Sequence, residues 1–340
     1  MVKARENCPS DVYKPFPTQV NNRSAILIFQ KDLWWTRKAD LSGVKDCSNF
    51  PVVCEWTMDL AQYDKADAVA YHFAGPWSPP DANKLSIGFC REAFFDHLHH
   101  FYPTTNEPSH WQYNVSATHQ LKSEIPFHYV RMHSVELGRK RRPVFKEMER
   151  AATLISSRCR SYTQRLELAQ LLAKQIPVYF YGKCLNNKEW PSDVGKNDLQ
   201  GLMGRHILNF AFENTNSEDY VTEKLFNALA SGAIPVYHGT NTVDKFLPSP
   251  DSIIRVSDFK SVEALGNYLK RVISDEALFN FHHSWRYKEL PNTLLDRFEF
   301  IKERWECRVC KYVYSRKFGC FWDHKRQQIG GPLLEFSRAD

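Results

Sequence analysis

Short apolar runs bounded by polar or turn residues recur along the whole chain. Runs of this length and composition are typical of strands that are buried on both faces of a parallel sheet. They cover residues 25–29, 66–72 and 84–90 in the first half, and 152–156, 177–181, 209–212 and 234–237 in the second. The hydrophobic pattern therefore predicts two groups of buried strands.

Helical patterns separate the strands of the second half. Leucines recur at helical spacing within residues 162–174, and a second helix is expected over residues 222–231, with Gly232 as its end. Alternating strands and helices favour βαβ units around a parallel sheet. The sequence predicts an α/β fold of two Rossmann-like domains that face each other across a cleft, with ligands bound at the strand ends.

The domain boundaries follow from where this pattern restarts. A basic run, Arg139 to Arg142, precedes the second group of strands and is interpreted as a solvated segment between domains. The expected parts are an N-terminal segment, a first domain, a second domain and a C-terminal segment. Their ranges are residues 1–23, 24–148, 149–300 and 301–340.

Composition narrows the class of protein. The 340 residues are 43% hydrophobic and 25% charged, which excludes a disordered or fibrous chain. The net charge of +6 is too mild for a nucleic-acid-binding surface, so we expect no nucleic-acid partner, whereas small anions are plausible. No apolar run is long enough to span a membrane, so either the protein is cytosolic or it is attached to a membrane only through an anchor absent from this sequence.

Nine cysteines exceed what a reducing compartment usually requires. Cys307, Cys310 and Cys320 with His324 could form a zinc site, while disulfides or free thiols are the alternatives. Cys159 and Cys184 could form one disulfide. Candidate N-glycosylation sites are Asn22 and Asn114, each followed by a serine two residues later.

The most informative stretch runs from residue 212 to residue 236. A buried strand ends in polar residues there, and a helix is expected to begin at Thr222 with Glu223 and Lys224 in its first turn. Free N–H groups and the positive end of a helix attract phosphate, to which Lys224 adds a charge, while Glu223 could accept hydrogen bonds from sugar hydroxyls. A capped surface helix with a Glu–Lys pair is the simpler alternative.

Other ligand motifs are absent or weak. The chain has neither G-x-G-x-x-G after a strand nor a P-loop. His97, His99 and His100 lie near Glu92 and Asp96, but their spacing fits a single ligand face poorly, so we expect no metal site.

The stretch from Phe212 to Gly239 resembles the donor-binding motif of the family 10 fucosyltransferases, which are inverting α1,3/α1,4 enzymes of the GT-B type that use GDP-fucose. The resemblance implies that GDP-fucose is contacted by Asn214, Tyr220, Glu223 and Lys224. Glu213, Val221 and Thr222 complete the motif.

The resemblance covers approximately residues 24–312. It implies that Arg165 contacts the diphosphate and that Glu92 is the general base. Two positions depart from the family pattern: Ser157 stands where many members have Asn, and Ala93 where members have Ser. For Glu92, a solvated carboxylate beside Arg91 is the alternative.

The cysteine pattern also resembles that of the family, whose members end in a Cys-x-x-Cys joined by disulfides to the N-terminal half. This implies partners for Cys307 and Cys310, for which Cys47 and Cys54 are the candidates. Such disulfides would hold the C-terminal segment, residues 301–340, packed back across the cleft. Family members usually reside in the Golgi lumen as type II membrane proteins, which is the localisation that the resemblance implies for this chain.

Inverting transfer needs a base to deprotonate the acceptor hydroxyl while the nucleotide leaves from the opposite face. Cations can stabilise the leaving diphosphate, so no metal cofactor is required, although a divalent metal could stimulate. The expected function is α1,3-transfer of fucose to a GlcNAc hydroxyl of a glycoprotein glycan. The alternatives are a degenerate binding protein, α1,4 or Lewis-type acceptor specificity, and a related enzyme that uses another nucleotide sugar.

Overall fold

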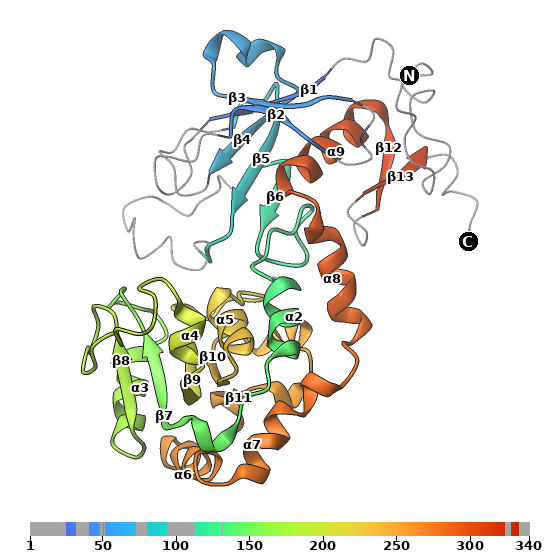
Figure 1. Ribbon diagram of the computed structural model, residues 1–340. Coiled ribbons are helices and arrows are strands. Elements are labelled where there is room, and N and C mark those ends of the chain that lie inside the picture. Colours follow the sequence, from blue (N-terminus) through green and yellow to red (C-terminus); the bar gives the residue numbers. More distant parts are fainter. Residues whose placement is uncertain are drawn as a thin grey trace. The chain divides into compact units, whose positions relative to one another are not determined.

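The computed structural model describes residues 25–31, 41–47, 50, 52–72, 80–93, 113–130, 132–323 and 328–332. These residues form two compact units, which are described separately (Figure 1). Unit 1 contains the described residues up to His128 and those from Glu299 onward, and unit 2 runs from Tyr129 to Phe298.

Unit 1 is built on a six-stranded sheet with the order β2-β3-β1-β4-β5-β6. The strands are β1 (Ile26–Gln30), β2 (Gly43–Lys45), β3 (Cys54–Thr57), β4 (Ala68–His72), β5 (Leu85–Cys90) and β6 (Val115–Thr118). Only the edge strand β2 is antiparallel to its neighbour within this sheet. All five residues of β4 are buried, as expected for a central parallel strand with both faces covered.

The C-terminal helix completes the core of unit 1. Helix α9 (Trp305–Phe318) follows α8 (Asn292–Lys302) and leads into a hairpin of β12 (Cys320–Asp323) and β13 (Gln328–Pro332). Trp305 stacks on Phe127 with ring centroids 4.7 Å apart and also packs against Trp56 and Phe89. The start of α9 is thereby held on the sheet by aromatic contacts from three segments.

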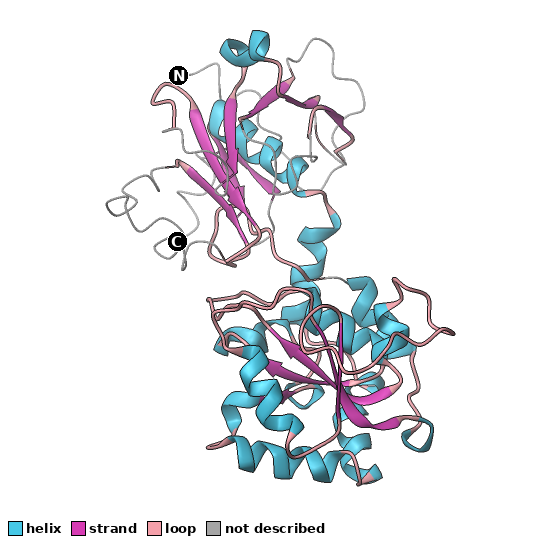
Figure 2. Cartoon of the chain, turned by 90° about the vertical axis from the view of Figure 1, so that its left-hand side faces the viewer, coloured by secondary structure: helices cyan, strands magenta, loops and turns pink. Residues whose placement is uncertain are grey.

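Unit 2 contains a five-stranded parallel sheet with the order β11-β10-β9-β7-β8. Its strands are β7 (Glu149–Ile155), β8 (Val178–Tyr181), β9 (His206–Phe212), β10 (Ile234–His238) and β11 (Ile254–Arg255). The helices around it are α2 (Met132–Lys140), α3 (Arg165–Ala173), α4 (Leu199–Met203), α5 (Glu223–Ser231), α6 (Val262–Val272) and α7 (Glu276–His283) (Figure 2). The central strand β9 is buried throughout.

The expected α/β class with two parallel sheets is confirmed, and each predicted apolar run is found in a strand. Gly232 ends α5 with a φ of 94°, a left-handed conformation that glycine adopts without strain. Helix α3 begins at Arg165, three residues later than expected, because Gln164 has a φ of 50° and Tyr162 and Thr163 bond to another loop.

The units divide the chain at places other than the expected boundaries of 148/149 and 300/301. The first division lies at residues 128/129, because α2, which carries Arg139 and Lys140, packs on α5 and so belongs to unit 2. The second falls within α8, and the segment that follows it is part of the core of unit 1. The expected N-terminal segment, residues 1–23, lies outside the described residues.

Among the described residues, none of the helices combines the length and apolar character that crossing a bilayer requires.

Candidate active site

The first turn of α5 is organised around a buried carboxylate. Glu213 directly follows β9 and its side chain is inaccessible to solvent. Its Oε1 accepts a hydrogen bond from the Thr222 backbone N–H at 2.7 Å, and its Oε2 accepts from the Thr222 hydroxyl at 2.8 Å and from Lys224 Nζ at 3.0 Å. Thr222 is also the N-cap of α5. One carboxylate thus fixes both the cap and the lysine.

Lys224 is charged and held in place, and its side chain remains partly accessible to solvent. Its Nζ lies 2.7 Å from the Thr222 hydroxyl and 3.5 Å from Glu223 Oε1, and its side chain is 28% exposed. Burial disfavours the ammonium form, but the carboxylates of Glu213 and Glu223 outweigh this effect and raise the pKa of Lys224. An ammonium group has three donors. The bonds to Glu213 and Thr222 use two of them, and the third N–H is directed either to Glu223 or to a ligand.

Arg165 brings a second cation to the same edge of the sheet. Its guanidinium donates to the backbone oxygens of Phe212 and Arg158, at 3.3 and 3.0 Å, and to the Ser156 hydroxyl at 3.2 Å. Phe212 ends β9, and Ser156 follows β7, so Arg165 lies at the carboxyl ends of two neighbouring strands.

The charge of Arg165 is not neutralised by a hydrogen-bonded carboxylate. The side chain is 5% exposed, and its Nε has no acceptor among the described residues. Burial lowers the pKa of the guanidinium, and Glu213 partly offsets this effect. A guanidinium that donates only to neutral oxygens retains its attraction for an anion.

The loop between β9 and α5 is fastened to the loop between β7 and α3. Tyr162 N–H donates to the backbone oxygen of Asn214 at 2.9 Å, and the Thr163 hydroxyl donates to that of Glu213 at 2.7 Å. Within the first loop, the hydroxyl of the buried Tyr220 donates to Asn214 Oδ1 at 3.3 Å. Val221, next in sequence, is also buried.

These bonds bring together every donor-binding residue that the sequence analysis named in unit 2. They lie at one end of the sheet, on the segments that follow β7 and β9. The residues are Arg165, Asn214, Tyr220, Val221, Thr222, Glu223 and Lys224.

A small cavity of about 160 Å³ adjoins this edge at the end of β10. It is lined by His238, Gly239, Thr240 and Asn241, with Arg255 from β11. A side chain at Gly239 would collide with the Tyr237 hydroxyl at 2.5 Å and with Glu213 Cγ at 2.9 Å. Glycine is therefore required for the close approach of this turn to the buried carboxylate.

Glu92 lies in unit 1, two residues after the end of β5, and is half-buried. The neighbouring Arg91 places its guanidinium 4.7 Å from the centre of the Phe127 ring and donates to the His128 backbone oxygen. Cys90, which precedes Arg91, is a buried free thiol, and burial raises its pKa to about 12. The carboxylate thus stands at the carboxyl end of a parallel strand, where α/β folds bind ligands.

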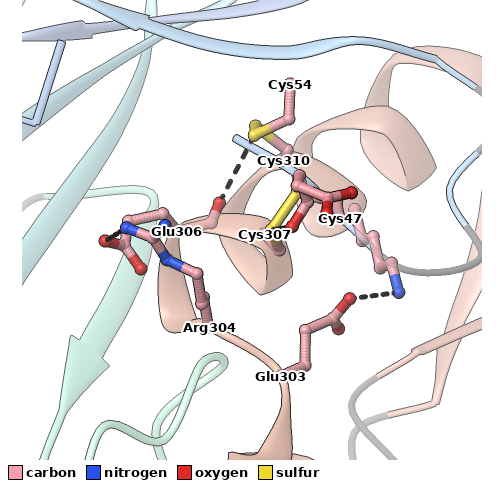
Figure 3. Close-up of a disulfide and its surroundings, with 9 residues drawn as sticks. Cys47, Cys54, Glu303, Arg304, Glu306, Cys307 and Cys310 are labelled. Atoms are coloured by element: carbon pink, nitrogen blue, oxygen red, sulfur yellow. Dashed lines mark hydrogen bonds and ion pairs between the residues drawn. A yellow bond between two sulfur atoms is a disulfide. The ribbon is translucent and has the colours of Figure 1, made fainter. Parts of the chain in front are cut away.

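The expected disulfides are present. Cys47 is bonded to Cys307 and Cys54 to Cys310, on successive turns of α9 (Figure 3). A third disulfide joins Cys159 to Cys184 in unit 2.

The zinc alternative is wrong because its thiolates are consumed. Cys307, Cys310 and Cys320 are all disulfide-bonded. Within the described residues, no group of three or more His, Cys, Asp or Glu side chains is arranged to hold a metal ion. His97, His99, His100 and Asp96 lie outside the described residues.

Of the two candidate glycosylation sites, Asn22 lies outside the described residues. Asn114 is exposed at the start of β6, where its Oδ1 accepts hydrogen bonds from the backbone and hydroxyl of Ser86. Its glycosylation stays a prediction.

Sequence reasoning missed the role of Glu213, which it placed in the motif without a function. A signal was available, since a glutamate directly after the apolar residues that end a buried strand is expected to be buried as well and therefore to need a cationic partner. It also missed Ser156 and Thr163, whose contacts depend on the meeting of two loops far apart in sequence.

Comparisons with a family profile and with individual proteins identify relatives of this chain. The profile described as "Glycosyltransferase family 10 (fucosyltransferase) C-term" matches residues 145–321, more than half of the chain. GDP-fucose protein O-fucosyltransferase 3 of Homo sapiens is 28% identical over 322 residues, covering 83% of this chain and 65% of that protein. An alpha-(1,4)-fucosyltransferase of Arabidopsis thaliana is 34% identical over 177 residues, covering 47% of this chain and 43% of that protein.

A crystal structure of an alpha1,3-fucosyltransferase with GDP-fucose matches with a TM-score of 0.48 and 18% identity, over 83% of this chain and 86% of that one. The chain spans less than two thirds of the length of either relative named above. The family profile covers α5 and both loops that meet at its first turn, and by this match the chain belongs to glycosyltransferase family 10, the fucosyltransferase family.

Proposed function

We propose that this protein transfers fucose from GDP-fucose to an acceptor hydroxyl with inversion at the fucose C1. The observation that carries the proposal is the pair of cations at the carboxyl edge of the unit 2 sheet. Lys224 is held by Glu213 with its side chain 28% exposed, and Arg165 donates only to neutral oxygens among the described residues. A diphosphate is the anion that suits two such cations beside a helix N-terminus.

In the proposed donor complex, Lys224 and Arg165 bind the diphosphate. Glu223, whose side chain is 40% exposed, accepts hydrogen bonds from ribose hydroxyls, while Asn214 and Tyr220 shape the loop around the nucleotide. As the bond between C1 and the phosphate oxygen breaks, negative charge grows on the diphosphate. The two cations stabilise that charge, so the protein itself supplies the electrostatic assistance for departure.

Glu92 is proposed as the general base. Its carboxylate takes the proton of the acceptor hydroxyl, whose oxygen bonds to C1 on the face opposite to the departing GDP. The position of Glu92 just beyond the end of β5 supports this role.

The proposed acceptor is a GlcNAc hydroxyl of a glycoprotein glycan, joined in an α1,3 linkage. A protein hydroxyl is a second candidate, because a relative named as a protein O-fucosyltransferase aligns with 83% of the chain. The relative named as an α1,4 enzyme supports an α1,4 linkage as a further alternative. In all three cases the base removes a proton from a hydroxyl, so the acceptor has to be found by assay.

The test is transfer from labelled GDP-fucose to N-glycan cores, N-acetyllactosamine and folded acceptor proteins. Glu92→Gln should abolish transfer and keep donor binding, while Glu147→Gln, an exposed control, should leave both unchanged. Linkage analysis of the product distinguishes α1,3 from α1,4. Donor binding without product on any acceptor would reject the enzyme in favour of a binding protein, and tighter binding of another nucleotide sugar would reject GDP-fucose as donor.

We also propose a lumenal location, in the Golgi. Three disulfides in the described residues support an oxidising compartment. Protease protection of the full-length protein in sealed microsomes tests this proposal, and digestion without detergent would reject it.

A further inference from the structure

A concavity of about 370 Å³ lies in unit 1 and is not used by the proposed reaction. Its walls come from the last turns of α9, from β12 and from the loop after β6. The side chains that give it chemical character are Glu124, Tyr312, Ser315, Arg316 and Trp322.

This concavity is displaced from Glu92 along the strands of the sheet. Glu124 bonds to Ser116, which is paired with Gly88 on β5, four residues before Glu92. Lys317 at the end of α9 pairs with Asp67, just before β4, which places this wall of the concavity towards the amino ends of the strands. Because four residues of strand span about 13 Å, more than the width of one pyranose ring, a sugar ring in the concavity is not the ring that reacts beside Glu92.

The walls combine aromatic and charged groups. The rings of Tyr312 and Trp322 meet edge to face with centroids 5.5 Å apart. The Trp322 Nε1–H is shielded from water and has no acceptor among the described residues. Arg316 is exposed at the rim, and Glu124 holds its Oε2 against the Ser116 hydroxyl at 2.5 Å.

This combination suits a sugar ring. Tyrosine and tryptophan present an apolar face with a polar edge, which matches the C–H face and hydroxyl rim of a pyranose. A carboxylate accepts hydrogen bonds from hydroxyls, and a guanidinium donates to them. The volume is within the range of sites for small ligands.

We propose that this concavity binds one neutral pyranose ring of a glycan, at a site separate from the site of transfer. The choice of a glycan as ligand rests on the proposed function. By holding one sugar residue of a glycoprotein, the site raises the effective concentration of the hydroxyl that reacts elsewhere on the same substrate.

Direct binding is the first test, without GDP-fucose. Methyl glycosides of GlcNAc, mannose and galactose are titrated into the full chain and followed by saturation-transfer NMR. At least one should bind, with Trp322→Ala weakening binding about tenfold or more and Glu124→Gln also weakening it. Tyr287→Ala removes an exposed aromatic ring from unit 2 and should have no effect. The proposal would be overturned if the wild type binds none of the glycosides, or if Trp322→Ala and Glu124→Gln both bind as tightly as the wild type.

Glu124→Gln provides a second variant in case Trp322→Ala fails to fold. It should itself fold, because its amide oxygen can still accept the hydrogen bonds from Ser116. Transfer kinetics then test whether the concavity acts in substrate binding and not in the chemical step. Trp322→Ala should raise KM for an intact glycoprotein without changing kcat, and should leave the kinetics with a short acceptor unchanged. Sugar binding without any transfer would reject the proposed function alone. Binding of a glycopeptide that survives its enzymatic deglycosylation would assign the concavity to peptide and overturn the inference.

Discussion

At the scale of single residues, the buried Glu213 explains how Lys224 can be both fixed and available. Burial raises the pKa of the Glu213 carboxyl, and Lys224 and the Thr222 N–H partly counter this effect. A buried carboxylate of this kind is stable only with its full set of partners, so the Glu213–Thr222–Lys224 group acts as one structural unit.

Glu213→Gln tests this unit, because glutamine has nearly the same shape and no charge. It leaves the Lys224 ammonium without its buried counter-ion and places an NH₂ group against either Thr222 or Lys224. We expect donor affinity, measured by calorimetry, to fall about 10- to 100-fold, as for loss of a charge-assisted hydrogen bond. Glu167→Gln, on α3, is the control. Wild-type affinity in Glu213→Gln would show that Lys224 does not depend on this carboxylate.

His72 provides a test of pH dependence in unit 1. Its side chain is buried at the end of β4, and burial lowers its pKa from 6.5 to about 4. The unfolded chain therefore binds more protons than the folded chain between these two values. Stability present above about pH 6.5 is lost as the pH falls through this window, by about 3 kcal/mol in total from this residue.

Thermal unfolding followed from pH 7 to pH 4 measures this loss. His72→Gln should reduce the slope of stability against pH, whereas His133→Gln, at an exposed position, should keep it. An unchanged slope in His72→Gln would mean that His72 is already charged in the folded protein.

At the scale of elements, the apolar runs predicted every strand that carries the site in unit 2, because buried parallel strands have a distinctive composition. The start of α3 could not be predicted, since Tyr162 and Thr163 bond to residues about 50 positions later in the chain. The packing of α2 on α5, where Gly138 allows close approach, could not be predicted either, because it also depends on residues far apart in the chain.

Gly138 tests the contact between these two helices. A Cβ at this position would lie 2.6 Å from the Leu229 backbone oxygen and 3.0 Å from the Trp285 ring. Gly138→Ala should therefore destabilise unit 2 by about 1–3 kcal/mol, despite the higher helix propensity of alanine, and lower its Tm by several degrees. In the control Gly195→Ala, the nearest atom is 3.8 Å away. Equal Tm values for the two variants would contradict the close packing.

At the scale of the whole molecule, two disulfides connect segments that are about 260 residues apart, and family resemblance rather than spacing identified their partners. They lie side by side on α9, so either one keeps the long loop closed when the other is absent. The stabilisation by the two disulfides is therefore not additive.

Removing one of these pairs opens only a short additional loop, whereas removing both releases the long one. On the chain-entropy view, the first removal should cost about 2–3 kcal/mol and the second about 5 kcal/mol. Chemical denaturation of Cys54→Ala/Cys310→Ala and of the variant that lacks both pairs measures this difference. Equal costs for the two steps would show that the pairs stabilise unit 1 independently.

The central claim is that the carboxyl edge of the unit 2 sheet binds GDP-fucose through Lys224 and Arg165. Calorimetric titration of the wild type, Lys224→Ala and Arg165→Ala with GDP-fucose tests it most directly. Lys260→Ala, which removes a lysine at an exposed position of unit 2, serves as the control. The account predicts that both site variants lose donor affinity about 10-fold or more while the control retains it. Wild-type affinity in a folded Lys224→Ala protein would contradict the account.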